Sequence, residues 1–451
     1  MGNAHSSSYV TLGVREKIGY GFGDLASNLS FGFVSLFLLY FYTDTYGLSA
    51  ADASLIFVIA RVIDAGFNIC IGYVVDKTNT RFGKLRPYLL FGALPLGLLT
   101  VLCFTAIETE AKFVYALTSY TVYCLAYTAV NTPYSALTNM MTQHEGSRAS
   151  LSVYRFVFAM IGFLIVSTTA EYLIGLFADP KTGYTFAVTC FAALATVFFL
   201  LCFKETRERV VIAHDAVPPT LGQMAEAIYC NKPLIMLSMF TVFFYIVYTL
   251  WMAIAIYFIK YILKNEDFTP QFFLIQTIAY IAGTVFCEKL VPVFGKKKLT
   301  ILSLVMGGGA LAAQYLFAGD SLVLIMACVV LLGMALGMGF VTMWSMIADT
   351  VEYAEWKTGV RAEGAIYGFF NFITKIAMAV GGGLAGWLLD FYGYSAEQIT
   401  DTALRGINLG MTLVPALMFV FGLVFILFYT LDEKTYVDIV DKIEARKRGN
   451  A

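Results

Sequence analysis

The segment RVIDAGFNICIG (residues 61–72) places three polar side chains inside an apolar stretch. At about 100° per residue, Arg61, Asp64 and Asn68 fall on one face of a helix. A charged side chain near the centre of a bilayer costs about 2.5–3.5 kcal/mol, so such residues generally serve an ion or substrate pathway. The structural alternative is a local ion pair between Arg61 and Asp64, although buried charge pairs seldom stabilise a fold more than apolar side chains do.

Further polar residues interrupt other apolar stretches. Lys375 has no acidic residue within a turn of it, and a lysine that faced lipid would be heavily penalised. It must therefore meet a partner on another helix or line a wet cavity, and we expect that partner to be Asp64. We expect one polar cavity between two halves of the chain to hold these two residues together with Asp24, Asn28, Thr128, Asn131 and Arg155.

The composition places these residues in a membrane. Of the 451 residues, 59% are hydrophobic and 14% are charged, whereas soluble domains average about 45–50% and about 25%. The apolar residues form about twelve runs of about 20 residues, the length of a spanning helix. This predicts an all-α membrane protein with spans near residues 18–42, 51–75, 88–107, 113–140, 150–177, 185–203, 234–262, 271–294, 299–317, 322–347, 364–390 and 406–429.

A long polar connection divides the spans six and six. The motif RFGKLRP after the second span resembles FGKKK after the eighth, which indicates an internal duplication. Lysine and arginine gather in the loops on the side of both termini, and the positive-inside rule makes that side cytoplasmic. The expected parts are a cytoplasmic N-terminal segment (1–17), an N-terminal six-helix bundle (18–203), a cytoplasmic central loop (204–233), a C-terminal six-helix bundle (234–429) and a cytoplasmic tail (430–451).

Six motifs follow one another along nearly the whole chain: GYGFGDLASN (19–28), ARVIDAGFN (60–68), DKTNTRFGKLRPYLLFGALP (76–95), YTAVNTPYSAL (127–137), ADTVEYAEWKTGVRAEG (348–364) and FITK (372–375). In these motifs the chain resembles the glycoside–pentoside–hexuronide:cation symporters, the melibiose permease group of the major facilitator superfamily. The resemblance implies twelve transmembrane helices in two pseudo-symmetric bundles, alternating access, and uptake of a sugar with Na⁺, Li⁺ or H⁺. The asparagines at positions 28 and 131 also make the chain resemble the glucuronide-carrier branch of this family.

The resemblance implies roles by position. Cation coupling falls to Asp64, Asn68, Thr128 and Lys375. Sugar binding falls to Asp24, Asn28, Arg61, Asn131 and Arg155, with Asp24 matching an acidic position in only some members. Apart from the resemblance, we expect salt bridges that ligands can bias to gate the transporter; the gating residues are Asp76, Arg81, Lys84, Arg86, Asp349 and Glu352.

Helix II departs from melibiose permease at the cation site. Asn68 stands where that permease has a second carboxylate, and Phe67 stands where it has an asparagine. A lone carboxylate is a poor cage for Na⁺, which prefers several oxygens, whereas one carboxylate that alternates between H⁺ and Lys375 is sufficient for proton coupling. We therefore favour H⁺ over Na⁺, with Na⁺ at Asp64, or a loss of coupling, as the alternatives.

The sugar site departs as well, because Asn28 and Asn131 replace two family aspartates. Amides still hydrogen-bond to hydroxyls, but two negative charges are removed. Since Arg61 and Arg155 are retained and guanidinium can pair with a carboxylate, the site favours an anionic glycoside or hexuronide. A neutral pentoside or disaccharide is the alternative.

The predicted protein is thus a secondary active transporter that imports a sugar with a cation. The sequence contains no HExxH motif, catalytic carboxylate pair or nucleophile triad, so we do not expect an enzyme. It also lacks a pore or selectivity-filter motif, so we do not expect a channel. A sugar sensor that does not transport is the alternative of another class. We expect no cofactor and no metal besides the coupling ion, no nucleic acid, and a monomer in the lipid of a bacterial inner membrane with both termini cytoplasmic.

Overall fold

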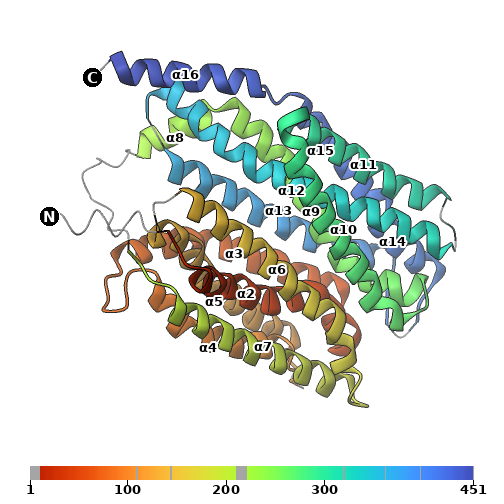
Figure 1. The fold of residues 1–451 in the computed structure, drawn as a ribbon. Helices are drawn as coiled ribbons and strands as arrows, with labels where there is room; N and C mark the ends of the chain where they lie inside the picture. Colours follow the sequence, from red (N-terminus) through yellow and green to blue (C-terminus); the bar gives the residue numbers. More distant parts are fainter. Residues whose placement is uncertain are drawn as a thin grey trace. The chain divides into compact units, whose positions relative to one another are not determined.

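The structure, a computed structural model, describes residues 11–107, 110–142, 145–209, 221–317, 319, 321–360, 362–396 and 398–449. These residues are almost entirely helical (Figure 1). Twelve helical segments among them are long and apolar enough to cross a membrane. This confirms the predicted all-α membrane fold.

Six spans come from the N-terminal part of the chain. Ser49 caps the second through the backbone N–H of Asp52 at 3.0 Å, and Asp179 caps the sixth through Lys181 and Thr182. The helices are α2 (Val14–Tyr40) with the π-helical turn η1 (Phe41–Thr45), α3 (Ala50–Lys77), α4 (Arg86–Cys103), α5 (Lys112–Met141), α6 (Glu145–Ile174) and α7 (Pro180–Glu205).

The remaining spans lie in the C-terminal part, together with two shorter helices at its polar ends. They are α8 (Leu221–Tyr229), α9 (Lys232–Tyr257) with the π-helical turn η2 (Phe258–Ile262), the 3₁₀ turn η3 (Glu266–Phe268), α10 (Thr269–Phe294), α11 (Lys296–Phe317), α12 (Leu322–Thr358), α13 (Glu363–Phe391), α14 (Asp401–Met411), α15 (Leu413–Leu427) and α16 (Glu433–Gly449).

Two predicted spans differ from the observed helices. Hydropathy ended the tenth span near residue 347, but α12 continues to Thr358 and ends at Gly359, which has φ +76°. Asp349, Thr350 and Ala354 on this extension are buried, and α8 and α16 pack against α12. Hydropathy detects only the apolar part of a helix, so it misses a polar extension that neighbouring helices cover.

The last span also differs, because it begins at Asp401 and is broken at Thr412 between α14 and α15. Pro415 lies in the first turn of α15. A proline is tolerated there because the first turn of a helix has no intrahelical partners for its N–H groups. The proline therefore marks a new helical start inside one apolar run.

The chain forms two compact units. The first contains Met1–His214, Asn265–Leu274 and Leu389–Thr400, and the second contains Asp215–Lys264, Ile275–Leu388 and Asp401–Ala451. In the first unit α2 packs on α6 and α7, α5 packs on α3 and α4, and α4 packs on α7. In the second unit α11 packs on α12 and α15, and α9 packs on α15, α12 and α14. The helices of each unit are labelled in Figure 1.

Candidate substrate and cation site

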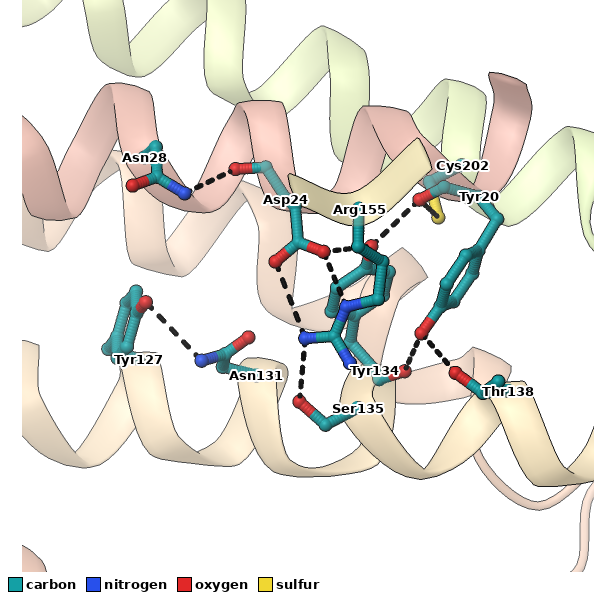
Figure 2. Close-up of polar contacts among 10 residues, drawn as sticks. All are labelled: Tyr20, Asp24, Asn28, Tyr127, Asn131, Tyr134, Ser135, Thr138, Arg155 and Cys202. Carbon is teal, nitrogen blue, oxygen red and sulfur yellow. Dashed lines mark hydrogen bonds and ion pairs between the residues drawn. The ribbon is translucent and has the colours of Figure 1, made fainter. Parts of the chain in front are cut away.

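An ion pair between Asp24 and Arg155 lies inside the first unit (Figure 2). The Nε of Arg155 on α6 lies 2.6 Å from Oδ2 of Asp24 on α2, and its Nη2 lies 3.5 Å from Oδ1. The hydroxyl of Tyr134 on α5 donates to the same Oδ2 at 2.9 Å. The carboxylate of Asp24 thus joins three helices through a charge-assisted contact.

Two tyrosines hold this ion pair in place. The rings of Tyr20 and Tyr134 stack with centroids 4.9 Å apart, and the guanidinium of Arg155 lies 5.2 Å from the centroid of Tyr134. Gly23 makes this packing possible, because a Cβ at that position would overlap the ring of Tyr134. The hydroxyl of Tyr20 shares a hydrogen bond of 2.5 Å with Thr138.

Arg155 keeps donors that Asp24 does not use. Its side chain is 30% exposed, against 12% for that of Asp24. Nη2 also donates to the Ser135 hydroxyl at 3.4 Å, and Nη1 donates to no described residue. A guanidinium carries five N–H donors in a planar fork, so Arg155 has donors left for a further acceptor.

The two asparagines lie to one side of the ion pair in Figure 2. Asn28 donates through Nδ2 to the backbone oxygen of Asp24 at 2.9 Å, and Asn131 donates to the Tyr127 hydroxyl at 3.3 Å. The Oδ1 of Asn131 is buried and accepts no hydrogen bond from a described residue. An unsatisfied buried acceptor costs about 1–3 kcal/mol, and a hydroxyl of a bound sugar would satisfy it.

A second set of polar contacts joins α3 and α5. Asp64, only 1% exposed, accepts a hydrogen bond from the Thr128 hydroxyl. One turn along both helices, Oδ1 of Asn68 accepts from the Thr132 hydroxyl at 3.0 Å. The structure therefore brings together three of the predicted cation residues and adds Thr132. The repeated spacing of four residues, in Asp64 and Asn68 and in Thr128 and Thr132, could have revealed it.

Arg61 lies one turn before Asp64 on α3 and contacts aromatic rings. Its guanidinium is 5.6 Å from the centroid of Phe31 on α2 and 5.9 Å from that of Tyr120 on α5. Such cation–π contacts stabilise a charge that is withdrawn from water. Lys375 lies on α13 in the second unit; its contact with Asp64, and the single cavity between the halves, stay predictions.

The loop RFGKLRP binds a carboxylate through its backbone N–H groups at the start of α4. The backbone N–H groups of Lys84, Leu85 and Arg86 donate to the Glu208 carboxylate at 2.8, 2.8 and 2.9 Å. Gly83 has φ +107°, and a Cβ there would overlap this carboxylate. A helix N-terminus favours an anion because its N–H groups lack partners. Sequence reasoning missed Glu208, whose position after α7 gave no signal.

The other loop arginines also find partners within the first unit. Arg86 donates through Nη2 to the backbone oxygen of Phe203 near the end of α7 at 2.7 Å. The guanidinium of Arg81 lies 4.6 Å from the centroid of Phe82. The Asp76 side chain lies outside the described part of the structure. These contacts give the predicted gating residues a structural role inside their own bundle.

The matching loop of the second unit shares a glycine at positive φ, although here that glycine alone separates α10 from α11. Gly295 has φ +83°, and Gly83 in the first unit also has a positive φ. A lysine follows each of these glycines. Lys297 donates to the backbone oxygens of Leu427 and Tyr429 after the last span at 3.1 and 2.7 Å. Each loop thus binds the end of the sixth helix of its unit, although Lys297 is one position earlier than Arg86 in the shared FGK alignment.

Two predicted acidic gating residues lie on the polar extension of α12. Both oxygens of Asp349 lie 2.7 Å from Nζ of Lys296, in the same unit. Glu352 follows on α12, about one turn after Asp349. Asp349 thus binds a lysine of its own unit.

Comparison with known proteins agrees with this architecture. Residues 19–433 match the family model described as MFS/sugar transport protein. The crystal structure of the nucleoside transporter NupG superposes with a TM-score of 0.66 at 14% sequence identity, over 90% of this chain and 98% of that one. At that identity the likeness concerns the fold alone, and it agrees with the predicted major facilitator fold.

Three relatives align over nearly their whole length. The symporter YnaJ of Bacillus subtilis, described as uncharacterized, is 36% identical over 96% of this chain and 95% of its own. The glucuronide carrier protein homolog of Escherichia coli is 34% identical over 96% of both chains. The isoprimeverose transporter of Lactiplantibacillus pentosus is 31% identical over 97% of this chain and 92% of its own.

These matches cover the two six-helix halves and the residues of the site. Twelve apolar helices and relatives that are transporters identify an integral, multi-pass membrane protein. The resemblance read from the sequence motifs is therefore confirmed. This chain belongs to the sugar transport family of the major facilitator superfamily, together with sugar symporters.

Proposed function

We propose that the protein imports an anionic sugar, a glycoside or hexuronide, by cation symport and alternating access. The observation that carries the anionic substrate is the exposed edge of Arg155, whose Nη1 has no partner among the described residues while its other edge holds Asp24. A guanidinium edge of this kind pairs with a carboxylate through two parallel hydrogen bonds. We also propose a monomer in a bacterial inner membrane with both termini cytoplasmic and no cofactor.

The position of the sugar follows from Asn131. It lies one turn before Ser135 on α5, and Ser135 contacts Arg155. A sugar whose anionic group binds Arg155 would therefore carry its hydroxyls along α5, where the unsatisfied Oδ1 of Asn131 accepts one of them. The relatives named for glucuronide and for isoprimeverose support a sugar substrate but differ in the sugar. The proposal that the sugar is anionic therefore depends on Arg155.

We propose that the coupling ion is H⁺ and that it binds Asp64, in exchange with Lys375. Asp64 is the carboxylate of the α3–α5 set, and the oxygens of Thr128, Asn68 and Thr132 already take part in hydrogen bonds there. The two pairs are one turn apart, about 6 Å along the helix axis. A Na⁺ ion needs several oxygens close together, and Asp64 is the one carboxylate of this set, whereas a proton needs one carboxylate.

The test is uptake into proteoliposomes of a radiolabelled phenyl glucuronide and of the matched phenyl glucoside. We expect an inward H⁺ gradient to drive accumulation of the glucuronide, an equal Na⁺ gradient to drive little, and the glucoside to accumulate less. Uptake that ignores both gradients would remove coupling through Asp64. Binding without uptake would indicate a sensor, and preferred accumulation of the glucoside would indicate a neutral substrate.

A further inference from the structure

We propose that Asp24 is a resident counter-ion of Arg155 which the anionic group of the substrate displaces, and that Asp24 then takes up a proton. This rests on the proposed anionic substrate and adds to it a proton site that is separate from Asp64. The site would make substrate binding and proton uptake one event. A substrate without an anionic group would leave the ion pair, and the proton, untouched.

The geometry of the ion pair supports an exchange of partners. Nε of Arg155 donates to Oδ2 of Asp24 at 2.6 Å, and Nη2 makes only a long contact of 3.5 Å with Oδ1. The Arg155 side chain is 30% exposed, and Nη1 donates to no described residue. A substrate carboxylate on the Nη1 edge would place two negative groups on one guanidinium. Two carboxylates in one site disfavour each other's charge, so we expect one of them to bind a proton.

Among the described groups near Asp24, Arg155 is the one that carries a positive charge. The titratable groups facing Asp24 from the packed helices are Tyr20 on α2, Tyr127 and Tyr134 on α5, Arg155 on α6 and Cys202 on α7. Phenols and thiols are neutral at neutral pH. Arg155 is thus the positive charge among them. A substrate anion that pairs with Arg155 would leave the Asp24 carboxylate without its counter-ion, and an unpaired buried charge is costly.

Tyr134 is arranged to serve both protonation states of Asp24. Its hydroxyl lies 2.9 Å from Oδ2 of Asp24 and 2.8 Å from the backbone oxygen of Tyr20. A phenol has one proton, so it donates to one of these acceptors at a time. With Asp24 ionised it donates to the carboxylate; with Asp24 protonated it accepts from the carboxylic acid and donates to the backbone oxygen.

The exchange conserves charge at the site. One substrate anion binds Arg155 as one proton from the same side of the membrane binds an oxygen of Asp24, so the charge of the site does not change. On the other side the proton leaves, the Asp24 carboxylate returns to Nε of Arg155, and the anion is released. The predicted stoichiometry of this step is one proton for each anion.

The test measures phenyl glucuronide binding to the purified full-length protein in a weakly buffered solution with a pH indicator. For the wild type we expect uptake of about one proton per ligand at Asp24, in addition to any proton taken up at Asp64, and, above neutral pH, an affinity that falls at least about tenfold per pH unit. Asp24→Asn removes both the competitor and the acid. It should bind glucuronide roughly tenfold more tightly or better, take up about one proton per ligand fewer than the wild type, and keep only the pH dependence that comes from Asp64.

Asp179→Asn is the matched control, because it makes the same change at an exposed carboxylate, and it should behave as the wild type. If Asp24→Asn takes up as many protons per ligand as the wild type and Asp64→Asn takes up none, all of the uptake belongs to Asp64 and the counter-ion exchange is wrong. If the wild type binds the glucoside but no glucuronide, the anionic substrate itself is wrong. The two failures therefore give different results.

A spectroscopic measurement covers the case in which Asp24→Asn does not fold. Infrared difference spectra of the wild type should show a protonated carboxyl band when glucuronide is added. Tyr134→Phe keeps the ring and removes the hydroxyl that would accept from the acid, so it should shift this band. The absence of the band in the wild type, or a band that Tyr134→Phe leaves in place, would overturn the proposal.

Discussion

The two units of this transporter differ most in what fills their interiors. The first unit holds charges, each with a described contact to another helix: Asp24, Arg61, Asp64 and Arg155. Both units contain clusters of rings, around Phe33 in the first and around Phe340 in the second. The Phe340 ring has four neighbours at centroid distances of 5.0, 5.3, 5.4 and 5.9 Å, namely Phe244, Tyr248, Tyr245 and Tyr280.

This difference separates two physical tasks. Charges inside a membrane protein persist only where nearby groups of the fold compensate them, and the proposed anion and proton sites both lie among the compensated charges of the first unit. Edge-to-face ring pairs contribute about 0.5–1.5 kcal/mol each beyond burial and do not depend on pH. The rings of the second unit therefore contribute to stability, and Lys375 adds a charge to that unit.

The ends of the units that carry the FGK loops are, in contrast, similar. Gly83 and Gly295 both adopt positive φ before a base that binds the end of the sixth helix of the unit. Backbone geometry and helix termini are thus common to both halves, while side chains in the interior have diverged. The following predictions test this contrast, from the largest effect to the smallest.

The ring cluster should carry more stability than any polar contact. Phe244 is 1% exposed and packs against Phe240, Phe340 and Phe419. Phe244→Ala should lower the free energy of unfolding by about 3–5 kcal/mol, measured by thermal unfolding in detergent. Phe244→Leu, as the control, should cost much less. A stable Ala variant that has lost transport would mean that this ring serves the substrate.

The charged interior should discriminate between substrates. Arg155→Lys keeps the charge and loses the planar fork. We expect glucuronide binding to weaken roughly tenfold or more, in line with about 1.5–3 kcal/mol for a charged hydrogen bond, and glucoside binding to change far less. Equilibrium binding of both ligands to one preparation measures the ratio. Equal losses for the two ligands would argue against pairing with an anion.

The α3–α5 pairs allow a change of coupling ion. Asn68→Asp places a second carboxylate one turn from Asp64 and adds a charge and an oxygen for a hard cation. We expect Na⁺ to stimulate uptake several-fold where it had little effect, measured as uptake against Na⁺ concentration at fixed pH. Asn68→Ser is the control without charge. A variant that stays indifferent to Na⁺ would mean that more than this residue excludes the ion.

The smallest effect concerns the start of α7. Hydrogen bonds from the side chain and backbone of Thr182 hold the pKa of the Asp179 carboxyl below its ordinary value. Its contribution to stability is therefore complete above the unfolded pKa, about 3.9, and is lost as the pH falls through the lower folded pKa. Asp179→Ala should lower the Tm slightly at pH 7, and the difference should shrink in acid. A Tm difference that does not change with pH would mean that the charge of Asp179 does not contribute to the stability of the helix start.

Much of the fold was predictable because its signals are local. Hydropathy located the twelve spans, the positions of Asp64, Asn68 and Thr128 on their helices followed from the period of 3.6 residues, and the FGK echo correctly indicated related loops. The extension of α12 was missed, since its buried polar residues are covered by α8 and α16, and burial by a neighbour leaves no mark on hydropathy.

The partners of the polar residues depended on tertiary structure. Asp24 and Arg155 are 131 positions apart, and Glu208 lies more than 120 positions from the N–H groups that bind it. A sequence shows that a charge in a spanning helix needs compensation, because the cost of burying it depends on the residue type. Which residue compensates it depends on which helix faces pack together, and that is decided only when the whole bundle has formed.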